Sequence, residues 1–517
     1  MTNRVDLSAY QYDEGYFLLR KDDTTTPYVT ETVDTGHYRH VFSYRGSRPT
    51  IKEAALGLLS AARHKVFIAS FRIGDTDLLK ALYDAVDRLR GGVYVISALD
   101  ERSLRKGLQT EDADAPGADD LRAQNKRFED MTSRGIFVRG HENFHAKFLI
   151  VDDRVALVSS ANLETSALTD TENRGATGEN GFVVSDRNEV LRLARYFTRL
   201  WHDCTYEMPP GEDHTVQNRT ASASPCRVPV ADLGHTPRVI WTYNGELGIH
   251  DTTHDIIGRA RRTLLLTSFS LNGLIEHPEL LLTPVERAMR VHRLQVSLLV
   301  RARNNHLATR QGATALAKLG VHIHADSLTH AKAVIADERY GALFSANFDA
   351  DHGFLSGAEV GVRIDNDQAL DEAIRHLHHA MTHADFTFAP RPTQRDMDRR
   401  LGASWRTAWP FKPEIPIVSA DAVWQQFVKA AQTGPVLYAT TRSQGLLLYA
   451  GDSEWTLSPP KPDTVGTQIL KHGGKSTHQN TKQQLDEWLS ARPQQAPHGK
   501  RGFCPAVLLR ADDRHED

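Results

Sequence analysis

The sequence predicts an α/β protein in which two units of similar plan follow one another, with a further α+β domain at the C-terminus. A chain of 517 residues is too long for one ordinary hydrophobic core, and 40% hydrophobic with 25% charged residues is typical of globular domains. Short apolar runs alternate with amphipathic stretches, which is the pattern of sheets covered by helices. One block of sequence also occurs twice. We therefore expect two tandem α/β sandwiches, each with a mixed sheet flanked by helices.

The first unit is expected over residues 1–204. Its apolar runs predict buried strands at KVFIAS (65–70), GVYVISALD (92–100) and GFVVSD (181–186), with helices at 78–90 and 188–201. Residues 102–130 are polar, and we interpret them as an insertion between strands. A linker is expected at 205–235, because that stretch is rich in Pro, Ser and Asp and shows neither helical nor strand periodicity.

The second unit is expected over residues 236–392. Strands are predicted at RTLLLTS (262–268), LQVSLLVRA (294–302) and EVGVRI (359–364), and a helix at 367–383. Residues 396–517 have no counterpart earlier in the chain and include two candidate strands, PVLYATT (435–441) and GLLLYAG (445–451). They predict a separate accessory domain, which could serve in substrate recognition.

The repeated block covers 133–164 (SRGIFVRGHENFHAKFLIVDDRVALVSSANLE) and 318–349 (KLGVHIHADSLTHAKAVIADERYGALFSANFD), at a constant offset of 185 residues. Both copies contain His-x-Lys, then Asp, then Ser-Ala-Asn. The matched residues are His145, Lys147, Asp152, Ser160 and Asn162 in the first copy, and His330, Lys332, Asp337, Ser345 and Asn347 in the second. One copy alone would be weak evidence, whereas recurrence in register indicates a shared task.

The residue types in this block suit the binding and cleavage of a phosphodiester. Residues two apart in a strand share a face, so each histidine points the same way as its lysine. Lysines neutralise anionic oxygens, and asparagine and serine side chains bind them. One histidine can attack phosphorus while the other donates a proton to the departing oxygen. The lysines can replace a metal ion, so neither a metal nor another cofactor is expected.

The remaining positions are expected to support these groups. Asp152 and Asp337 lie in VDDRV and ADERYG, which predict hairpin turns, and their role is expected to be structural. Each imidazole needs a partner that fixes its tautomer. Glu179 and Glu359 each open a strand downstream of a histidine and are the candidates.

The paired His-x-Lys-x4-Asp motifs, each followed by Ser-x-Asn, resemble the phospholipase D superfamily over roughly residues 50–390. The resemblance implies two halves about a pseudo-twofold axis, one composite active site, and a covalent phosphohistidine intermediate without an obligatory metal. It implies a catalytic set of His145, Lys147, Asn162, Glu179, His330, Lys332, Asn347 and Glu359. Ser159 and Phe344 stand where the family often has glycine, and Phe344 is expected to narrow the pocket. The motif does not decide which histidine attacks; His145 is the working choice.

The motif leaves the substrate open between nucleic acid and lipid, and an inactive binding scaffold is a third interpretation. Six basic residues of the C-terminal domain are interleaved with Trp455 and Trp488, which suits nucleic-acid binding: Lys461, Lys471, Lys475, Lys482, Lys500 and Arg501. A solvated domain with core tryptophans would have the same composition. A phospholipase or phosphatidyltransferase should show a membrane-directed segment, and none is predicted. We therefore favour a nuclease, with a restriction or defence role suggested only by the added domain.

Composition sets the remaining expectations. The formal net charge of −3 means that any surface for a polyanion must be local. The start of the sequence lacks the pattern of an export signal, and its three cysteines are odd in number, so a reducing, cytoplasmic setting is expected.

Two further stretches invite a ligand-binding interpretation. HLHHAMTH (376–383) could place His376, His379 and His383 on one helical face, but a solvated face is favoured over a metal site. GGKST (473–477) lacks the first glycine of a phosphate-binding loop, so a flexible basic loop is favoured.

Overall fold

The computed structural model describes residues 15–20, 26–30, 36–99, 118–141, 143–169, 177–211, 215–219, 236–304, 306–393 and 396, and six strands of the C-terminal region. The chain divides into two compact units. The larger unit comprises residues 23–301 and 315–385, and the smaller comprises 1–22, 302–314 and 386–517.

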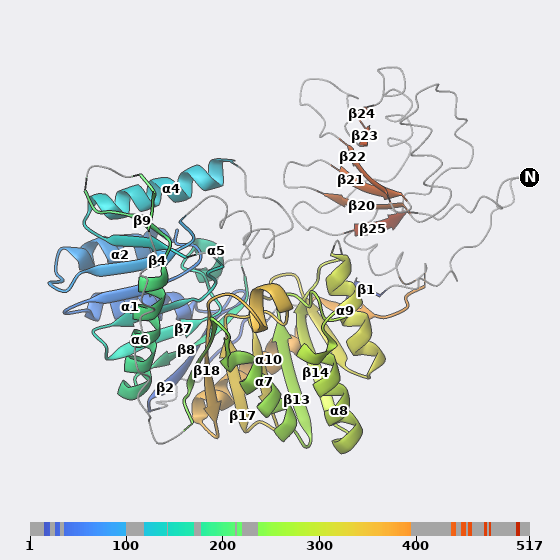
Figure 1. Cartoon of the computed structure of the whole chain (residues 1–517). Helices are drawn as coiled ribbons and strands as arrows, with labels where there is room; N and C mark the ends of the chain where they lie inside the picture. The colour runs from blue at the N-terminus through green and yellow to red at the C-terminus, as the bar shows by residue number, and fades with distance from the viewer. Residues whose placement is uncertain are drawn as a thin grey trace, which may run out of the picture. The chain divides into compact units, whose positions relative to one another are not determined.

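The larger unit contains two mixed sheets (Figure 1). The first has the strand order β10-β9-β5-β4-β3-β6-β7-β8-β2. Its strands are β2 (Tyr38–Ser43), β3 (Val66–Ala69), β4 (Val93–Ser97), β5 (Phe137–Gly140), β6 (Phe148–Val151), β7 (Val155–Ser159), β8 (Glu179–Val184), β9 (Tyr206–Met208) and β10 (Gln217–Asn218). Strands β3, β4 and β5 are parallel, and the other neighbours are antiparallel. Every residue of β6 is buried, as expected for a strand covered on both faces.

The second sheet repeats this order through β15-β14-β13-β16-β17-β18-β11-β12. Its strands are β11 (Val239–Tyr243), β12 (Glu246–Leu247), β13 (Thr263–Ser268), β14 (Gln295–Arg301), β15 (His322–Asp326), β16 (Ala333–Ala336), β17 (Tyr340–Phe344) and β18 (Glu359–Asp365). Strands β13, β14 and β15 are parallel, like β3, β4 and β5 of the first sheet. The α/β class with mixed sheets flanked by helices, expected from the sequence, is confirmed.

Two helices lie between the sheets. Helix α6 (Arg187–Asp203) contacts β3 and β7 of the first sheet and β11 of the second, and α10 (Gln368–Thr382) contacts β2 and β18. Asp186 and Asp367 cap these helices by accepting hydrogen bonds from backbone amides of their first turns. Phe148 and Ile150 of β6 therefore belong to a core that residues of both sheets share, so the two halves are not separate hydrophobic bodies.

The other faces of the sheets carry the remaining helices. Leu149 and Val151, which alternate with Phe148 and Ile150, pack in a second core with α1 and α2. The helices of the chain outside the inter-sheet layer are α1 (Thr50–Ala61), α2 (Thr76–Val86), α4 (Ala118–Ser133), α5 (Thr165–Leu168), α7 (Gly248–Arg259), α8 (Leu282–His292), α9 (Leu307–Lys318), and the short turns η2 (Pro278–Leu280) and η3 (Ala350–Phe354). Within the described ranges, no helix combines the length and apolar character that crossing a membrane requires.

Two equivalent hairpins carry the motif aspartates. Asp152 lies between β6 and β7 with φ 54°, and Asp337 lies between β16 and β17 with φ 53°. The Asp152 carboxylate accepts backbone hydrogen bonds from residues 63, 64 and 65 at 2.8, 2.7 and 2.9 Å, and Asp337 accepts the same set from 261, 262 and 263 at 2.8, 2.7 and 2.9 Å. Burial opposes the charge, yet these donors lower the pKa of both carboxyl groups. Each aspartate thus ties its hairpin to the start of the neighbouring strand β3 or β13.

Three segments differ from the sequence expectation. The first part of the expected linker forms β9 and β10, and β9 pairs with β5, so the first sheet extends beyond residue 204. These strands have two or three residues, too few for a periodic signal. Residues 118–130 of the expected polar insertion are helical, because α4 exposes a polar face while Phe128 and Met131 are buried.

The third difference concerns the smaller unit. Strand β1 (Tyr16–Leu19), expected within the first domain, pairs with β19 (Phe386–Ala389), and the Asn304 side chain both donates to and accepts from the backbone of Phe17. This unit also contains an antiparallel sheet in the order β24-β23-β22-β21-β20-β25. Its strands are β20 (Val436–Thr440), β21 (Leu446–Ala450), β22 (Ser453–Leu457), β23 (Leu470–His472), β24 (Lys475–Ser476) and β25 (Phe503–Ala506). The two strands predicted for the C-terminal domain are thereby confirmed as β20 and β21.

Candidate active site

The two motif histidines pair with glutamates from opposite halves. His145, three residues before β6, has its Nδ1 atom 2.8 Å from Oε1 of Glu359, the first residue of β18. His330, three residues before β16, has its Nδ1 atom 2.8 Å from Oε1 of Glu179, the first residue of β8. All four are nearly buried: the side-chain exposure of His145 and Glu359 is 12% and 0%, and that of His330 and Glu179 is 6% and 1%.

Backbone contacts between the halves explain this crossing. The amide of His145 donates to the carbonyl of Ala358 at 3.0 Å, and the amide of His330 donates to the carbonyl of Gly178 at 2.8 Å. Each histidine segment therefore runs beside the residue that precedes the opposite half's glutamate. The contacts are reciprocal, as they are in a two-fold arrangement, so neither half completes a histidine–glutamate pair from its own residues.

Charge and hydrogen bonding fix the state of the Glu179 carboxyl. Burial alone would raise its pKa, but the charges of His330 and Lys332 and hydrogen bonds from His330 and Ser160 lower the pKa to about 2. Glu179 is thus an anion that accepts the Nδ1 proton of His330. With Nδ1 assigned as the protonated nitrogen from this hydrogen bond, Nε2 is the atom available for chemistry.

The motif serines hold the glutamates. Ser160 Oγ donates to Glu179 Oε2 at 2.5 Å, and Ser345 Oγ donates to Glu359 Oε2. Both serines are fully buried, and each hydroxyl also accepts a hydrogen bond from a backbone amide of the strand that carries its glutamate. This differs from the expectation that Ser160 and Ser345 contact substrate, because their hydroxyl groups are already engaged with the carboxylates. Thr177 adds a further donor to Glu179, at 2.7 Å.

The motif lysines are buried at the same place but differ in their contacts. Lys332 Nζ lies 3.1 Å from His330 Nε2, whereas Lys147 Nζ donates to the backbone oxygen of His145 at 2.7 Å. Their exposure is 0% and 1%, so both charges are held inside the protein next to the imidazoles. An ammonium group can donate to Nε2 only when that nitrogen carries no proton, so the contact with Lys332 indicates an unprotonated Nε2 in His330.

The motif asparagines follow β7 and β17. Asn162 and Asn347 are 3% and 1% exposed, and the Asn162 amide nitrogen lies 3.5 Å from the Glu164 carboxylate. The structure therefore joins His145 to Glu359 and His330 to Glu179 across the two halves, with each motif lysine in contact with the histidine of its own half. It does so through contacts that the linear order of the motifs does not display.

Asp349 is a residue of this neighbourhood that the motif analysis did not single out. Its Oδ2 atom accepts a hydrogen bond from Ser270 at 2.6 Å, and burial raises its pKa to about 7. The charges of His145 and Lys332 act against that rise, which places groups from both motifs near one carboxyl. The signal was present in the repeat, because Asp349 stands two residues after Asn347 in the register of Glu164.

The two halves are not equal at this position. Glu164 forms an ion pair with Arg72 at 3.3 Å, whereas Asp349 accepts a hydrogen bond from the Ser270 hydroxyl and forms no ion pair among the described residues. The first carboxylate is compensated by a cation, and the second is left in a buried place that favours its neutral form. Asp349 is therefore a buried carboxyl group close to His145 whose pKa is raised to about 7.

Aromatic rings complete the surroundings, and one expectation fails here. Phe71 lies 6.2 Å from the His145 ring, and Phe269 lies 5.1 Å from the His330 ring in an edge arrangement. Phe344, expected to narrow the pocket, instead packs in the buried core 6.1 Å from Phe348. Its ring also lies 6.1 Å from that of Phe354, so the described ring contacts of Phe344 are with core phenylalanines.

The histidine-rich helix also differs from its expected solvated face. His376 is 2% exposed and packs on Phe42 at 4.6 Å, and burial lowers its pKa well below the ordinary value, whereas His379 and His383 are half-buried. Across the described ranges, no cluster of three His, Cys, Asp or Glu side chains is placed to share a metal ion. Of GGKST only Lys475 and Ser476 are described, as β24, and the side chains of the predicted basic and tryptophan residues of that domain lie outside the described residues.

Comparison with known proteins gives one family match and several distant structural neighbours. Residues 56–201 match the family model described as the PLD-like domain of cardiolipin synthase. No curated protein sequence matches the chain. Among solved structures, phosphatidylserine synthase of Haemophilus influenzae Rd KW20 is similar at 12% identity and TM-score 0.48, over 72% of this chain and 89% of that one.

Two further solved structures are similar. Polyphosphate kinase of Porphyromonas gingivalis has 13% identity and TM-score 0.42, over 66% of this chain and 50% of that one. Nuc of Salmonella typhimurium, a phospholipase D family member, has 16% identity and TM-score 0.26, over 29% of this chain and 96% of that one.

Proposed function

Because the chain belongs to the phospholipase D superfamily, whose members cleave or transfer phosphodiesters, we propose that it hydrolyses nucleic-acid phosphodiester bonds through a phosphohistidine intermediate. The observation that carries the proposal is the crossed pairing of His145 with Glu359 and His330 with Glu179. Two imidazoles oriented by carboxylates from opposite halves suit a reaction that needs one nucleophile and one acid.

The contacts favour His330 as the nucleophile, in place of the working choice of His145. Lys332 Nζ lies 3.1 Å from His330 Nε2, which requires an unprotonated Nε2; its lone pair becomes free to attack when Lys332 turns to a phosphate oxygen of the substrate. His145, whose Nδ1 atom lies 2.8 Å from Glu359 Oε1, is then the histidine left to act as the acid.

The proposed reaction has two displacements. His330 Nε2 attacks phosphorus, the phosphorus–oxygen bond to the leaving strand breaks, and His145 gives that oxygen its proton. Water then attacks the phosphohistidine, His145 takes the proton, and the phosphorus–nitrogen bond breaks to release the phosphate end. Lys147, Lys332, Asn162 and Asn347 are proposed to bind the non-bridging oxygens, where charge builds up in each transition state.

Nucleic acid is proposed as the substrate on the sequence of the C-terminal domain. Basic residues there, including Lys471 and Lys475, are interleaved with Trp455 and Trp488, a composition that suits phosphate contact and base stacking. A phospholipid phosphodiesterase or transferase is the second candidate, because the matching family model describes a domain of cardiolipin synthase.

One experiment separates the candidates. Purified protein is incubated with plasmid, single-stranded DNA, RNA and phosphatidylcholine vesicles, each with and without EDTA. We expect cleavage of nucleic acid that survives EDTA and is lost in His145→Ala and His330→Ala, with His378→Ala, an exposed histidine of α10, as the matched control. Cleavage of the vesicle lipid alone would select the second candidate, and no cleavage of any substrate by the unsubstituted protein would support the scaffold interpretation.

The order of the two histidines is tested by trapping. Rapid quenching of a labelled substrate in alkaline detergent, which preserves the phosphorus–nitrogen bond, should recover phosphoprotein from His145→Ala and none from His330→Ala, since the nucleophile survives only in the first. Phosphoprotein from His330→Ala would reverse the assignment.

A further inference from the structure

The two halves compensate a matched pair of carboxyl groups differently. Glu164 and Asp349 occupy the same position of the repeat, and their partners Arg72 and Ser270 are matched as well. Each partner lies seven residues after the last backbone amide that binds the motif aspartate of its half. An arginine in one half and a serine in the other therefore leave the second carboxyl group alone without a counter-charge.

Asp349 is buried and has one oxygen to spare. It is 5% exposed, its Oδ2 atom accepts from Ser270, and its Oδ1 atom has no hydrogen-bond partner among the described residues. The charged groups that act on it come from three segments: His145 before β6, Lys332 before β16 and Glu359 of β18. Burial outweighs the two cations and raises the pKa of Asp349 to about 7, so the carboxyl group gains or loses its proton near neutral pH.

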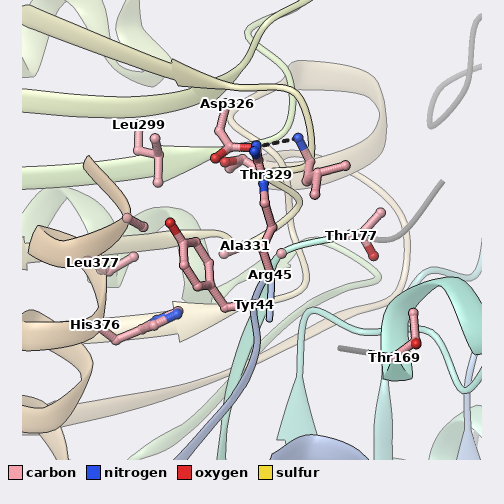
Figure 2. Close-up of a pocket in the computed structure, with 13 residues that line it drawn as sticks. Tyr44, Arg45, Thr169, Thr177, Leu299, Asp326, Thr329, Ala331, His376 and Leu377 are labelled. Atoms are coloured by element: carbon pink, nitrogen blue, oxygen red, sulfur yellow. Dashed lines mark hydrogen bonds and ion pairs between the residues drawn. The ribbon is translucent and has the colours of Figure 1, made fainter. Parts of the chain in front are cut away.

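The glutamates of the site are also supported unequally. Glu179 accepts hydrogen bonds from its motif serine and from Thr177, which Figure 2 shows next to the segment of Thr329, just before the second motif histidine. Glu359 accepts from its motif serine, but the position that matches Thr177 is Gly357, which has no side chain. The negative charge near Glu359 is thus less compensated, and this is where Asp349 lies.

The charges of the catalytic groups nearly cancel, so a single proton on Asp349 decides their sum. When His145 is protonated for its role as acid, the cations are its ring and the two motif lysines, and the anions are the two glutamates. Glu164 does not change the sum, because Arg72 neutralises it. The site therefore has one net positive charge when Asp349 is protonated and none when it is ionised. A phosphodiester carries one negative charge and is attracted only by the first form.

We propose that the site binds a phosphodiester anion with a proton on Asp349, so that binding at neutral or higher pH transfers one proton from the buffer to this carboxylate. Ionised Asp349 would leave two anions close together in a buried place, which disfavours the complex. The proposal rests on the proposed phosphodiester chemistry, and it applies to nucleic acid and lipid alike. It makes Asp349 a positioning residue that acts through the charge of the site.

The test counts protons, so it does not depend on turnover. Full-length protein carrying His330→Ala, which lacks the proposed nucleophile, is titrated calorimetrically with bis(4-nitrophenyl) phosphate in buffers of different ionisation enthalpy. The single charge of this diester is constant across the pH range used. At pH 8 we expect binding to take up nearly one proton more than it does when Asp349→Asn is added. Between pH 6 and pH 8.5 the affinity should fall at least about tenfold more than in that variant.

Two further variants give opposite outcomes. The hydrogen bond from Ser270 lowers the pKa of Asp349, so Ser270→Ala should move the fall in affinity to higher pH. Glu164→Gln replaces the matched carboxyl group, which is already neutralised by Arg72, and should keep the proton uptake. A loss of folding in Asp349→Asn alone therefore cannot imitate the expected pattern.

Proton uptake that is the same with and without Asp349, a shift to lower pH in Ser270→Ala, or no saturable binding of the diester at pH 6 would each overturn the proposal. Asp349-dependent proton uptake in a protein that hydrolyses no phosphodiester would refute the proposed hydrolysis and leave the proton-linked site standing. Cleavage of nucleic acid by a protein whose proton uptake ignores Asp349→Asn would do the reverse. Failure of the two proposals is therefore distinguishable.

Discussion

The crossed pairing predicts that Glu179 is energetically coupled to His330 and independent of His145. Relative to the usual 4.5, the pKa of Glu179 is lowered to about 2, which corresponds to about 3 kcal/mol. Because Lys332 and Ser160 contribute part of that stabilisation, we expect about 1–2 kcal/mol for the His330 contact alone.

The assay is a double-mutant cycle on the free energy of unfolding in urea at pH 7. His330→Ala and Glu179→Gln, singly and together, should show a coupling of about 1–2 kcal/mol, whereas His145→Ala with Glu179→Gln should be additive within about 0.5 kcal/mol. The mirror cycle pairs Glu359→Gln with His145→Ala. Coupling found within each half and absent across the halves would refute the reasoning.

The dependence on pH gives an internal check on the sign. Glu179 has a lower pKa in the folded protein than in the unfolded chain, so its stabilisation is complete above pH 4.5 and is lost as pH falls toward 2. The crossed coupling measured at pH 3 should therefore be smaller than at pH 7. A coupling that grew on acidification would show that the carboxylate is not the stabilised form.

Three further predictions follow from single carboxyl and hydroxyl groups. The pKa of Asp349 is raised from 3.8 to about 7, so the free energy of unfolding should fall as pH rises from 3.8 to 7 and ionises this carboxyl in the folded protein. Asp349→Asn should remove up to about 4 kcal/mol of the fall in unfolding free energy measured between pH 4 and pH 8. An unchanged pH dependence would place the pKa of Asp349 elsewhere. Asp152→Ala should cost about 2–3 kcal/mol in urea unfolding, because three backbone amides lose their acceptor, while neighbouring Asp153→Ala, an ion-pair residue at 29% exposure, should cost under about 1 kcal/mol; equal effects would contradict the anchoring role. Ser160→Ala should lower kcat about 10–100-fold on the cleaved substrate with little change in KM, since it orients Glu179 rather than contacting substrate, and a selective rise in KM would restore the substrate-binding interpretation.

The repeated motif could be identified from the sequence because its two copies recur in the same register. His145 and His330, their lysines and the hairpin turns follow from short-range spacing and strand alternation, which sequence displays directly. The crossed pairing of Glu179 and Glu359 does not follow from spacing. Each glutamate comes after the histidine of its own half in the sequence, and only the packing of the two halves decides which imidazole it binds.

Other features escaped because they depend on environment. Asp349 and Glu164 occupy matching positions, but Glu164 pairs with the cation Arg72 whereas Asp349 accepts from the neutral hydroxyl of Ser270, and both partners lie far away in the sequence. His376 belongs to a stretch that looks polar, yet its side of α10 packs between the sheets, so tertiary contact overrides composition. The short strand β9 escaped because edge strands of this length carry too few residues to show alternation.

The reciprocal bond pattern has a consequence for ancestry and for engineering. A lone ancestral half with this motif would have met its glutamate only on a second copy, so the present chain is what fusion of a self-associating precursor would leave behind. A chimaera that joins the halves of two diverged relatives should therefore fold but have low activity. Activity should return when each exchanged histidine is accompanied by the glutamate with which it pairs in the opposite half.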